Sequence, residues 1–316
     1  MLDQRMFSKK NLLLLIPICF FFQSLFSQTL YSRAYGNQNK PAIIYIHGGP
    51  RGNSTLFEGT TAQKLADLGF YVIVYDRRGE GRSSDPSAKI TYMEAINDLN
   101  GLIAQYKLKK VTLIGHSFGG IVSTLFTQRY PTKVERLILV AALFAQQESY
   151  NHILNSATVD AVQKGDTSTL NKIERIKTLD TSSADYRQSV YDIGSSYGYF
   201  KMPRPTKESI AVNTLYETGV FFKQNIRNDQ APILFYKNES RRNIDTKPIL
   251  STLSSNGLKL FGIYGQNDGI FSKKELSDLK EITGRNNWFS IENCSHYPFV
   301  DQQVVFLKAV KSIMRK

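Results

Sequence analysis

The sequence predicts an α/β fold in which a mostly parallel central sheet is flanked by helices and interrupted by one large helical insertion. Three observations indicate this fold. Short apolar runs alternate with segments whose apolar residues have helical spacing, most of the runs end in or near Gly, Asp or His, and one long polar block breaks the alternation. The chain has 316 residues, of which 41% are hydrophobic, and this is enough for one large core with an insertion.

The predicted strands are short and apolar, as expected for strands buried on both faces of a parallel sheet. They span residues 42–49, 71–79, 111–117, 136–143, 258–268 and 287–296. The helical patterns between the early strands span residues 54–69, 91–108 and 119–130. Strand and helix in alternation predict a parallel sheet covered by helices.

The alternation stops after Phe144, and the insertion is predicted to span residues 146–245. This block is polar, rich in Ser, Thr and Asp, and contains helical patches with aromatic residues. A core formed by residues 29–145 and 246–316 would then surround it in the sequence. Ligands of open α/β sheets bind beyond the carboxyl ends of the strands, so we expect the insertion to be a helical lid over a substrate pocket. The alternative is a covering layer with no part in the chemistry.

The N-terminus has the composition of a signal peptide. Basic residues precede an apolar run over residues 12–22, which is too short to span a bilayer, and the chain becomes polar directly afterwards. Residues 1–28 are therefore predicted to be a signal peptide that exports the protein to the periplasm or the extracellular space, with no stable membrane insertion after cleavage. An uncleaved membrane anchor and lipidation at Cys19 are the alternatives.

Charge and cysteine content argue against several other classes of protein. The formal net charge is +13, but Lys and Arg are dispersed rather than grouped in a stripe, so nucleic-acid binding is not expected. After removal of a signal peptide Cys294 would be the only cysteine, which excludes an internal disulfide. No Cys or His pair has metal-ligand spacing. The segment RGEGRSS lacks the third glycine of a dinucleotide-binding motif because Ser84 stands there. We expect no metal and no organic cofactor.

Ser117 is the candidate nucleophile. It lies in Gly115-His116-Ser117-Phe118-Gly119, between a predicted strand and a predicted helix. A tight strand-to-helix turn crowds the residues beside the serine, so small glycines are needed there. The following helix directs its N-terminal N–H groups toward charge that develops near Ser117.

A serine hydroxyl needs a base and an acid that orients the base. His296 and Asp268 lie at the ends of the last two predicted strands, and the chain order Ser117, Asp268, His296 is that of a serine–acid–histidine triad. Asp268 could instead be a turn residue, and His296 a hydrogen-bonded loop histidine. Asp301 is too near His296 in sequence to be the first choice of acid.

The remaining histidines suit the role of base less well. His47 precedes two glycines in another loop, His116 adjoins the serine and is expected to face away from it, and His152 lies in the insertion.

With these residues in this order, the sequence resembles the α/β-hydrolases, and the resemblance covers the chain from about Leu30 to its end. HGGP at 47–50 and DRRGEGRSS at 76–84 are similar to the segments that flank the site in the proline iminopeptidase branch. The resemblance implies a Ser-His-Asp hydrolase. Gly49 can turn its N–H toward the substrate oxygen, so the N–H groups of Gly49 and Phe118 are expected to form the oxyanion hole.

Two departures from that branch leave the substrate open. The elbow reads GHSFGG, which is common in esterases, and Arg51 occupies the fifth position of the loop motif, with glycine displaced to Gly52. A prolyl aminopeptidase-like peptidase would also need a carboxylate for the substrate's ammonium, and Glu217 in the insertion is the candidate. The alternatives are a carboxylesterase acting on small acyl esters and a non-catalytic binding protein of the same fold. In either enzyme the lid restricts the substrate to a small molecule or a short peptide.

Overall fold

The computed structural model describes residues 30–316, so the predicted signal peptide lies outside the described residues. The described chain forms a seven-stranded sheet in the order β1-β3-β2-β4-β5-β6-β7. The strands are β1 (Ser32–Tyr35), β2 (Ala42–Ile46), β3 (Tyr71–Tyr75), β4 (Val111–His116), β5 (Val134–Val140), β6 (Lys259–Gly265) and β7 (Trp288–Ile291). β1 pairs antiparallel to β3, and every other pairing is parallel. The α/β class with a mostly parallel sheet is thus confirmed.

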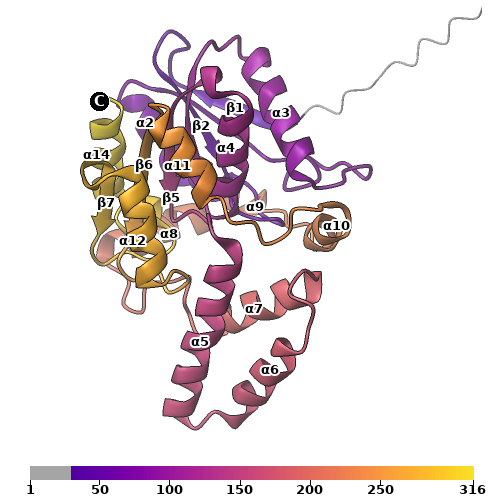
Figure 1. Cartoon of the computed structure of the whole chain (residues 1–316). Helices are drawn as coiled ribbons and strands as arrows, with labels where there is room; N and C mark the ends of the chain where they lie inside the picture. The colour runs from indigo at the N-terminus through magenta and orange to yellow at the C-terminus, as the bar shows by residue number, and fades with distance from the viewer. Residues whose placement is uncertain (1–29) are drawn as a thin grey trace, which may run out of the picture.

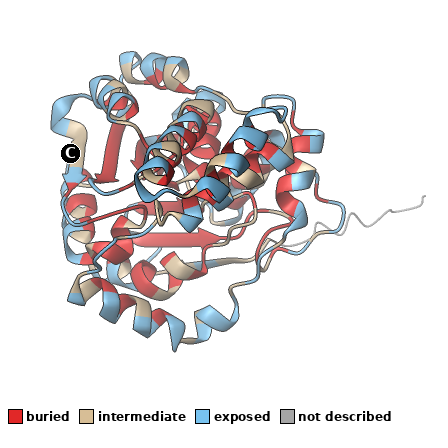
Figure 2. Cartoon of the chain, turned by 90° about the horizontal axis from the view of Figure 1, so that it is seen from below, coloured by how far each residue is buried: buried red, intermediate tan, exposed pale blue. Residues whose placement is uncertain are grey.

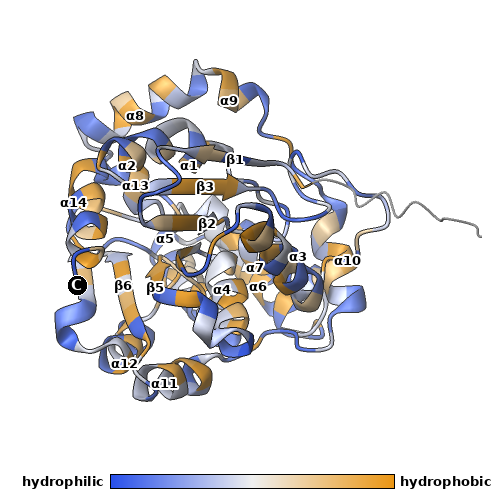
Figure 3. Cartoon of the chain, turned by 90° about the horizontal axis from the view of Figure 1, so that it is seen from above, coloured by the Kyte–Doolittle hydropathy of each residue, from blue (hydrophilic) through white to orange (hydrophobic). Residues whose placement is uncertain are grey.

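Helices cover both faces of the sheet because neighbouring strand residues point to opposite sides. On β2, Ile44 packs in a core cluster with residues of α3, α4, α11 and α12, whereas Ile43 packs in a second cluster with residues of α1, α2 and α14. Figure 2 shows the strands almost entirely buried and the outer helix faces exposed, and Figure 3 shows the matching division between apolar and polar residues. These covering helices are α1 (Thr55–Phe57), α2 (Gln63–Asp67), α3 (Tyr92–Gln105), α4 (Phe118–Arg129), α11 (Lys247–Ser255), α12 (Lys273–Thr283) and α14 (Gln303–Ile313).

The predicted helix over residues 54–69 contains an internal irregularity. A π-helical turn, Glu58–Ala62, lies between α1 and α2. The strand β1 was not among the predicted strands, since it has only 4 residues and none of them is buried. Short 3-10 turns at Pro131–Lys133 and Arg285–Asn287 lead into β5 and β7, and α13 (Pro298–Asp301) precedes α14.

Of the helices between β5 and β6, six lie within the predicted insertion, and α11 follows it. The six are α5 (Gln146–Lys164), α6 (Thr167–Lys177), α7 (Ala184–Ser196), α8 (Lys207–Glu217), α9 (Val220–Lys223) and α10 (Gln230–Asn238). In Figure 1, α5, α6 and α7 extend away from the sheet, whereas α8 lies against the core. The two ends of the insertion meet at an antiparallel bridge between Ala145 and Asp245. The insertion therefore leaves and rejoins the core at one place.

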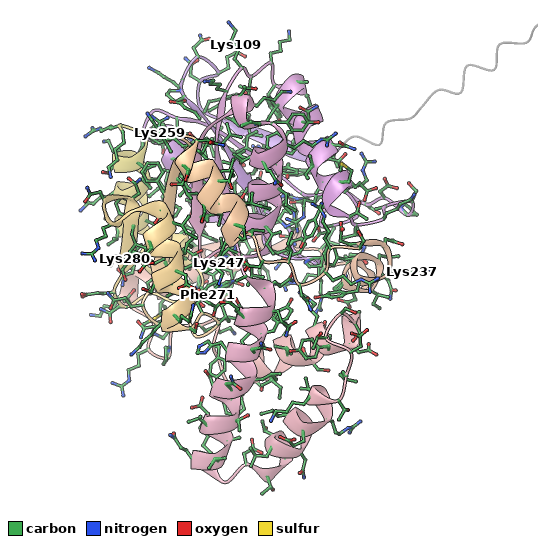
Figure 4. All side chains as sticks on the ribbon, viewed as in Figure 1. Lys109, Lys237, Lys247, Lys259, Phe271 and Lys280 are labelled. Atoms are coloured by element: carbon green, nitrogen blue, oxygen red, sulfur yellow. The ribbon has the colours of Figure 1, made fainter. Side chains whose placement is uncertain are left out.

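Basic residues are spread over the surface of the described chain. Figure 4 labels four exposed lysines that belong to well-separated parts of the sequence: Lys109, Lys237, Lys259 and Lys280. Lys247 instead binds Glu148 and Asp278.

Candidate active site

Ser117 occupies a strained turn between β4 and α4. Its backbone has φ 52° and ψ −125°, a positive φ that non-glycine residues rarely adopt. The turn is held by the Leu143 N–H, which donates to the Ser117 carbonyl at 2.9 Å.

The glycines beside Ser117 are required by close contacts. A Cβ on Gly115 would lie 2.3 Å from Ser123 Oγ, and one on Gly119 would lie 2.2 Å from the carbonyl oxygen of Ile46. Neither contact leaves room for a side chain, which explains the Gly-x-Ser-x-Gly pattern.

His296 and Asp268 form a buried hydrogen-bonded pair. Asp268 lies in the turn after β6 and His296 in the loop after β7, and His296 Nδ1 donates to Asp268 Oδ2 at 2.9 Å. Their side chains are 3% and 0% exposed. A carboxylate at Nδ1 fixes the tautomer that leaves Nε2 available as a base. Among the histidines of residues 30–316, His296 alone has a carboxylate partner at ion-pair distance.

Asp301 holds the histidine loop rather than the histidine itself. It lies at the C-terminal end of α13 and accepts a hydrogen bond at Oδ2 from the Ser295 N–H at 2.8 Å. Burial raises the pKa of the Asp301 carboxyl. Its part in fixing this loop was not predicted from the sequence.

The other histidines of the described chain are engaged elsewhere. The Arg77 N–H donates to His47 Nε2 at 3.0 Å, and burial, followed by the charge of Arg77, keeps the pKa of His47 well below its usual value. His116 Nε2 contacts the main-chain oxygen of His296 at 2.9 Å, and its pKa is lowered to about 3, chiefly by burial. His152 lies on α5 next to Ser156.

Ser117 and His296 line a single cavity of about 270 Å³ together with Gly48, Gly49 and residues of the insertion. In the described chain no hydrogen bond joins the Ser117 hydroxyl to His296, whose hydrogen bonds are those of Nδ1 with Asp268 and of the main-chain oxygen with His116. In ligand-free enzymes this bond is often long, and it tightens when substrate binds.

The loop of residues 47–52 passes close to Ser117. A Cβ on Gly48 would lie 3.1 Å from Ser117 Cβ, whereas a Cβ on Gly49 would lie 2.3 Å from Arg77 Nη2. Phe118 begins α4, so its N–H belongs to the first helical turn, where no intrahelical acceptor is available. Phe118 is therefore adjacent to the serine, whereas Gly49 lines the same cavity as Ser117 and it is Gly48 that approaches the serine side chain.

Two buried residues of the segment 76–84 support this loop. Arg77 Nη2 donates to the Gly48 carbonyl at 2.9 Å, and Glu80 Oε1 accepts from the N–H groups of Arg51 and Gly52 at 2.7 and 3.1 Å. Arg77 and Glu80 are themselves paired at 2.8 Å. The sequence placed this segment beside the site but did not reveal that it shapes the loop through an ion pair.

Arg51, at the position where the loop motif has glycine, adopts φ 108°. Its backbone thus takes a conformation that favours glycine. Its side chain pairs with Asp229 of the insertion at 2.5 Å. The displaced glycine has a separate steric reason, because a Cβ on Gly52 would lie 2.2 Å from the Gly48 carbonyl oxygen.

The insertion supplies one acidic and two basic side chains to the cavity wall. Glu217 lies at the C-terminal end of α8 and is exposed, Arg187 lies on α7 and is buried, and Arg227 follows α9. With Arg51 from the loop, the lining residues that the structure describes include three arginines and one carboxylate. The sequence analysis singled out Glu217 but neither arginine of the insertion.

Comparison with known families gives the assignment. The model of the alpha/beta hydrolase fold family matches residues 41–303. The chain belongs to the α/β-hydrolase fold family. This confirms the resemblance inferred from the sequence and makes the protein a hydrolase by family.

Known relatives include esterases and peptidases. An uncharacterized protein of Mycobacterium tuberculosis is 41% identical over 32% of this chain and 29% of its own length, so this match spans less than a third of the relative. A putative proline iminopeptidase of Mycoplasma pneumoniae is 31% identical over 40% of both chains. The pimeloyl-[acyl-carrier protein] methyl ester esterase of Vibrio campbellii is 25% identical over 90% of this chain and 98% of its own length.

Solved structures with the same fold have low sequence identity. A proline iminopeptidase-related protein of Thermus thermophilus has a TM-score of 0.66 at 22% identity and covers 90% of this chain and 93% of that one. An esterase of Exiguobacterium antarcticum has a TM-score of 0.58 at 18% identity, covering 91% and 96%.

Within residues 30–316, no three His, Cys, Asp or Glu side chains are grouped so that they could hold a metal ion. No helix in the same range combines the length and apolar composition needed to cross a bilayer.

Proposed function

We propose that the protein is a serine hydrolase that cleaves an ester or amide bond of a small substrate through an acyl-enzyme. The observation that carries this proposal is the 2.9 Å hydrogen bond between Asp268 and His296, which lines the same cavity as Ser117. His296 Nε2 takes the proton as Ser117 Oγ attacks the carbonyl carbon, and it then protonates the leaving group. Water, activated by the same imidazole, cleaves the acyl-enzyme.

The N–H groups of Gly49 and Phe118 stabilise the oxyanion of the tetrahedral intermediate in this proposal. The strained backbone of Ser117 supports it, because such strain is found where a side chain must be presented to a reacting group. The insertion acts as a lid, and a cavity of about 270 Å³ suits a small acyl group better than a long polymer.

Of the two candidate substrate classes, we favour carboxyl esters. An aminopeptidase needs an anionic site for the substrate's ammonium, and such a site is ineffective when positive charge dominates the cavity. Here Glu217 is the one lining carboxylate among the described residues, and it is exposed, whereas the buried Arg187 and the exposed Arg227 line the same cavity and Arg51 is paired with Asp229. This argues against the peptidase activity that the HGGP loop suggests.

A prolyl aminopeptidase is the second candidate. Glu217 lines the cavity, as that activity would require, and the Mycoplasma pneumoniae relative is a putative proline iminopeptidase.

Three substrates separate the two classes. A short-chain aryl ester, a prolyl arylamide and its N-acetylated form are compared by kcat/KM. Rapid ester cleavage with no arylamide turnover supports the esterase, whereas arylamide turnover that is lost on acetylation supports the aminopeptidase. Labelling by a fluorophosphonate that disappears in Ser117→Ala tests the serine hydrolase itself, and a chain that is not labelled would be a binding protein.

A further inference from the structure

Arg187 is a buried guanidinium without an acidic partner in the described chain. It lies on α7, it is 8% exposed, and it lines the cavity that contains Ser117 and His296. Its hydrogen bond is a long one, from Nη2 to the carbonyl oxygen of Gly49 at 3.4 Å. No carboxylate of residues 30–316 lies within ion-pair distance of it, since each ion pair of that range involves other residues.

The other buried arginines of the described chain, Arg77 and Arg136, pair with carboxylates, and so does the partly buried Arg82. Arg77 pairs with Glu80 at 2.8 Å, and Arg82 pairs with both Asp76 and Glu58 at 2.7 Å. A guanidinium cannot lose its proton at any physiological pH, and a buried charge without a partner destabilises the folded chain. Arg187 therefore lacks the stabilisation that Arg77 and Arg82 receive from this chain, and a bound anion would provide it.

The neighbours of Arg187 connect it to the proposed catalytic residues. Its guanidinium lies 5.6 Å from the ring centroid of Tyr191, one turn further along α7, and Tyr191 packs on Phe200 with ring centroids 5.0 Å apart. Phe200 packs against His296, with the two ring centroids 5.5 Å apart. On the other side, the hydrogen bond to Gly49 ties Arg187 to the loop that passes Ser117.

We propose that Arg187 binds a carboxylate of the substrate, so that the protein acts on small esters that carry a negative charge away from the scissile bond. A planar guanidinium matches a carboxylate in a bidentate arrangement, and the small cavity suits this compact anion. Arg227, in the same wall, adds to the positive potential. The proposal rests on the proposed serine hydrolase function and narrows its substrate class.

Two matched pairs of esters test this inference. In the first pair the charge is on the acyl side, with mono-4-nitrophenyl glutarate compared with its neutral methyl ester. In the second pair it is on the alcohol side, with the butyrate ester of 4-hydroxybenzoate compared with that of its methyl ester. The wild type is expected to prefer the charged member of one pair by kcat/KM, and that pair identifies the side that Arg187 binds.

Arg187→Gln should reduce that preference on the order of 10- to 100-fold, the range expected for losing hydrogen bonds to a charged group. Arg187→Lys keeps the positive charge but not the planar guanidinium, so it should retain part of the preference for the charged ester. Arg175→Gln is the matched control, because Arg175 is an exposed arginine of α6 that does not line the cavity. Arg175→Gln should keep the wild-type preference.

A binding measurement covers the case in which Arg187→Gln does not fold. Glutarate should raise the melting temperature of Ser117→Ala and of the wild type more than the uncharged dimethyl glutarate does. Equal kcat/KM within both ester pairs, together with no shift by glutarate, overturns the inference while the serine hydrolase proposal stands. Failure to cleave any of the four esters, with no fluorophosphonate labelling of Ser117, overturns the proposed function instead.

Discussion

The imidazole Nε2 of His116 lies 2.9 Å from the main-chain oxygen of His296. A carbonyl oxygen can only accept, so His116 Nε2 carries the hydrogen and the ring is the neutral tautomer protonated there. The residue before the candidate nucleophile thus holds the backbone of the candidate base. The sequence placed His116 beside the serine, facing away from it, but could not indicate this contact, since 180 residues separate the two histidines.

Acid should destabilise the protein partly through His116. Its pKa is lowered to about 3 in the folded chain, mainly by burial, whereas an unfolded histidine titrates near its usual value of about 6.5. The unfolded chain therefore binds more protons between these two values. The stability from the neutral ring is complete above the unfolded pKa and is lost as the pH falls toward the folded one.

The expected loss from His116 between pH 7 and pH 5 is about 2 kcal/mol of unfolding free energy. Urea unfolding at the two pH values measures it. His116→Asn keeps a donor for the His296 oxygen but does not titrate, so its stability should change less than that of the wild type. Equal changes in the two chains would contradict the assignment, because all other titrating groups are shared.

Turnover should depend on Asp268 much more than on Asp301. Ser117→Ala and His296→Ala are expected to lower kcat by several orders of magnitude with the fold kept, and Asp268→Asn should do so by about 10⁴-fold, because the wrong histidine tautomer is favoured. Asp301→Asn retains an oxygen that can accept from the Ser295 N–H, so its loss should be far smaller. Steady-state kinetics with circular dichroism checks these values, and a larger loss for Asp301→Asn would show that the acid was misassigned.

Two glycines in helices should respond to alanine in opposite directions. Gly119→Ala should destabilise the protein by at least about 2 kcal/mol, because its Cβ would lie 2.2 Å from the Ile46 carbonyl oxygen. Gly101 lies on the exposed side of α3, and a Cβ there would meet no atom of another element within 4 Å, so Gly101→Ala should stabilise by about 0.5–1 kcal/mol. Chemical denaturation of both variants tests the pair. A tolerated Gly119→Ala would mean that the turn has more room than these contacts leave.

Export remains a proposal that the N-terminal sequence supports. We expect a mature N-terminus near Gln28 or Thr29, produced by cleavage after the short apolar run. Mass spectrometry of protein recovered from its native cell decides this, with recovery from each cell fraction as the control. Intact Met1 on protein from the cytoplasmic fraction would rule out the cleaved signal.

The sequence was informative about the site where local geometry restricts residue type. The glycines around Ser117 follow from one tight turn, and the positions of Asp268 and His296 follow from where parallel strands end, so all three could be proposed from the sequence. The strand β1 was not predicted because its four residues are all at least partly exposed and form no apolar run.

The charge environment could not be predicted in the same way. Arg187 resembles any other arginine of the insertion in the sequence, and only the fold reveals that it is buried without a carboxylate while Arg77 and Arg82 have theirs. Burial and ion pairing are determined by segments distant in the sequence, whereas a turn is determined by its own residues.

The bridge between Ala145 and Asp245 has a consequence for how this protein can change. The segment between them leaves and rejoins the core at this bridge, where the Thr246 N–H also donates to the Phe144 carbonyl at 2.6 Å. A different set of helices joined at these two positions would leave unchanged the sequence of β4, β6 and β7, which precede Ser117, Asp268 and His296. Under the proposed function, substrate choice would then depend on one contiguous piece of the chain that can be replaced separately from the residues that break the bond.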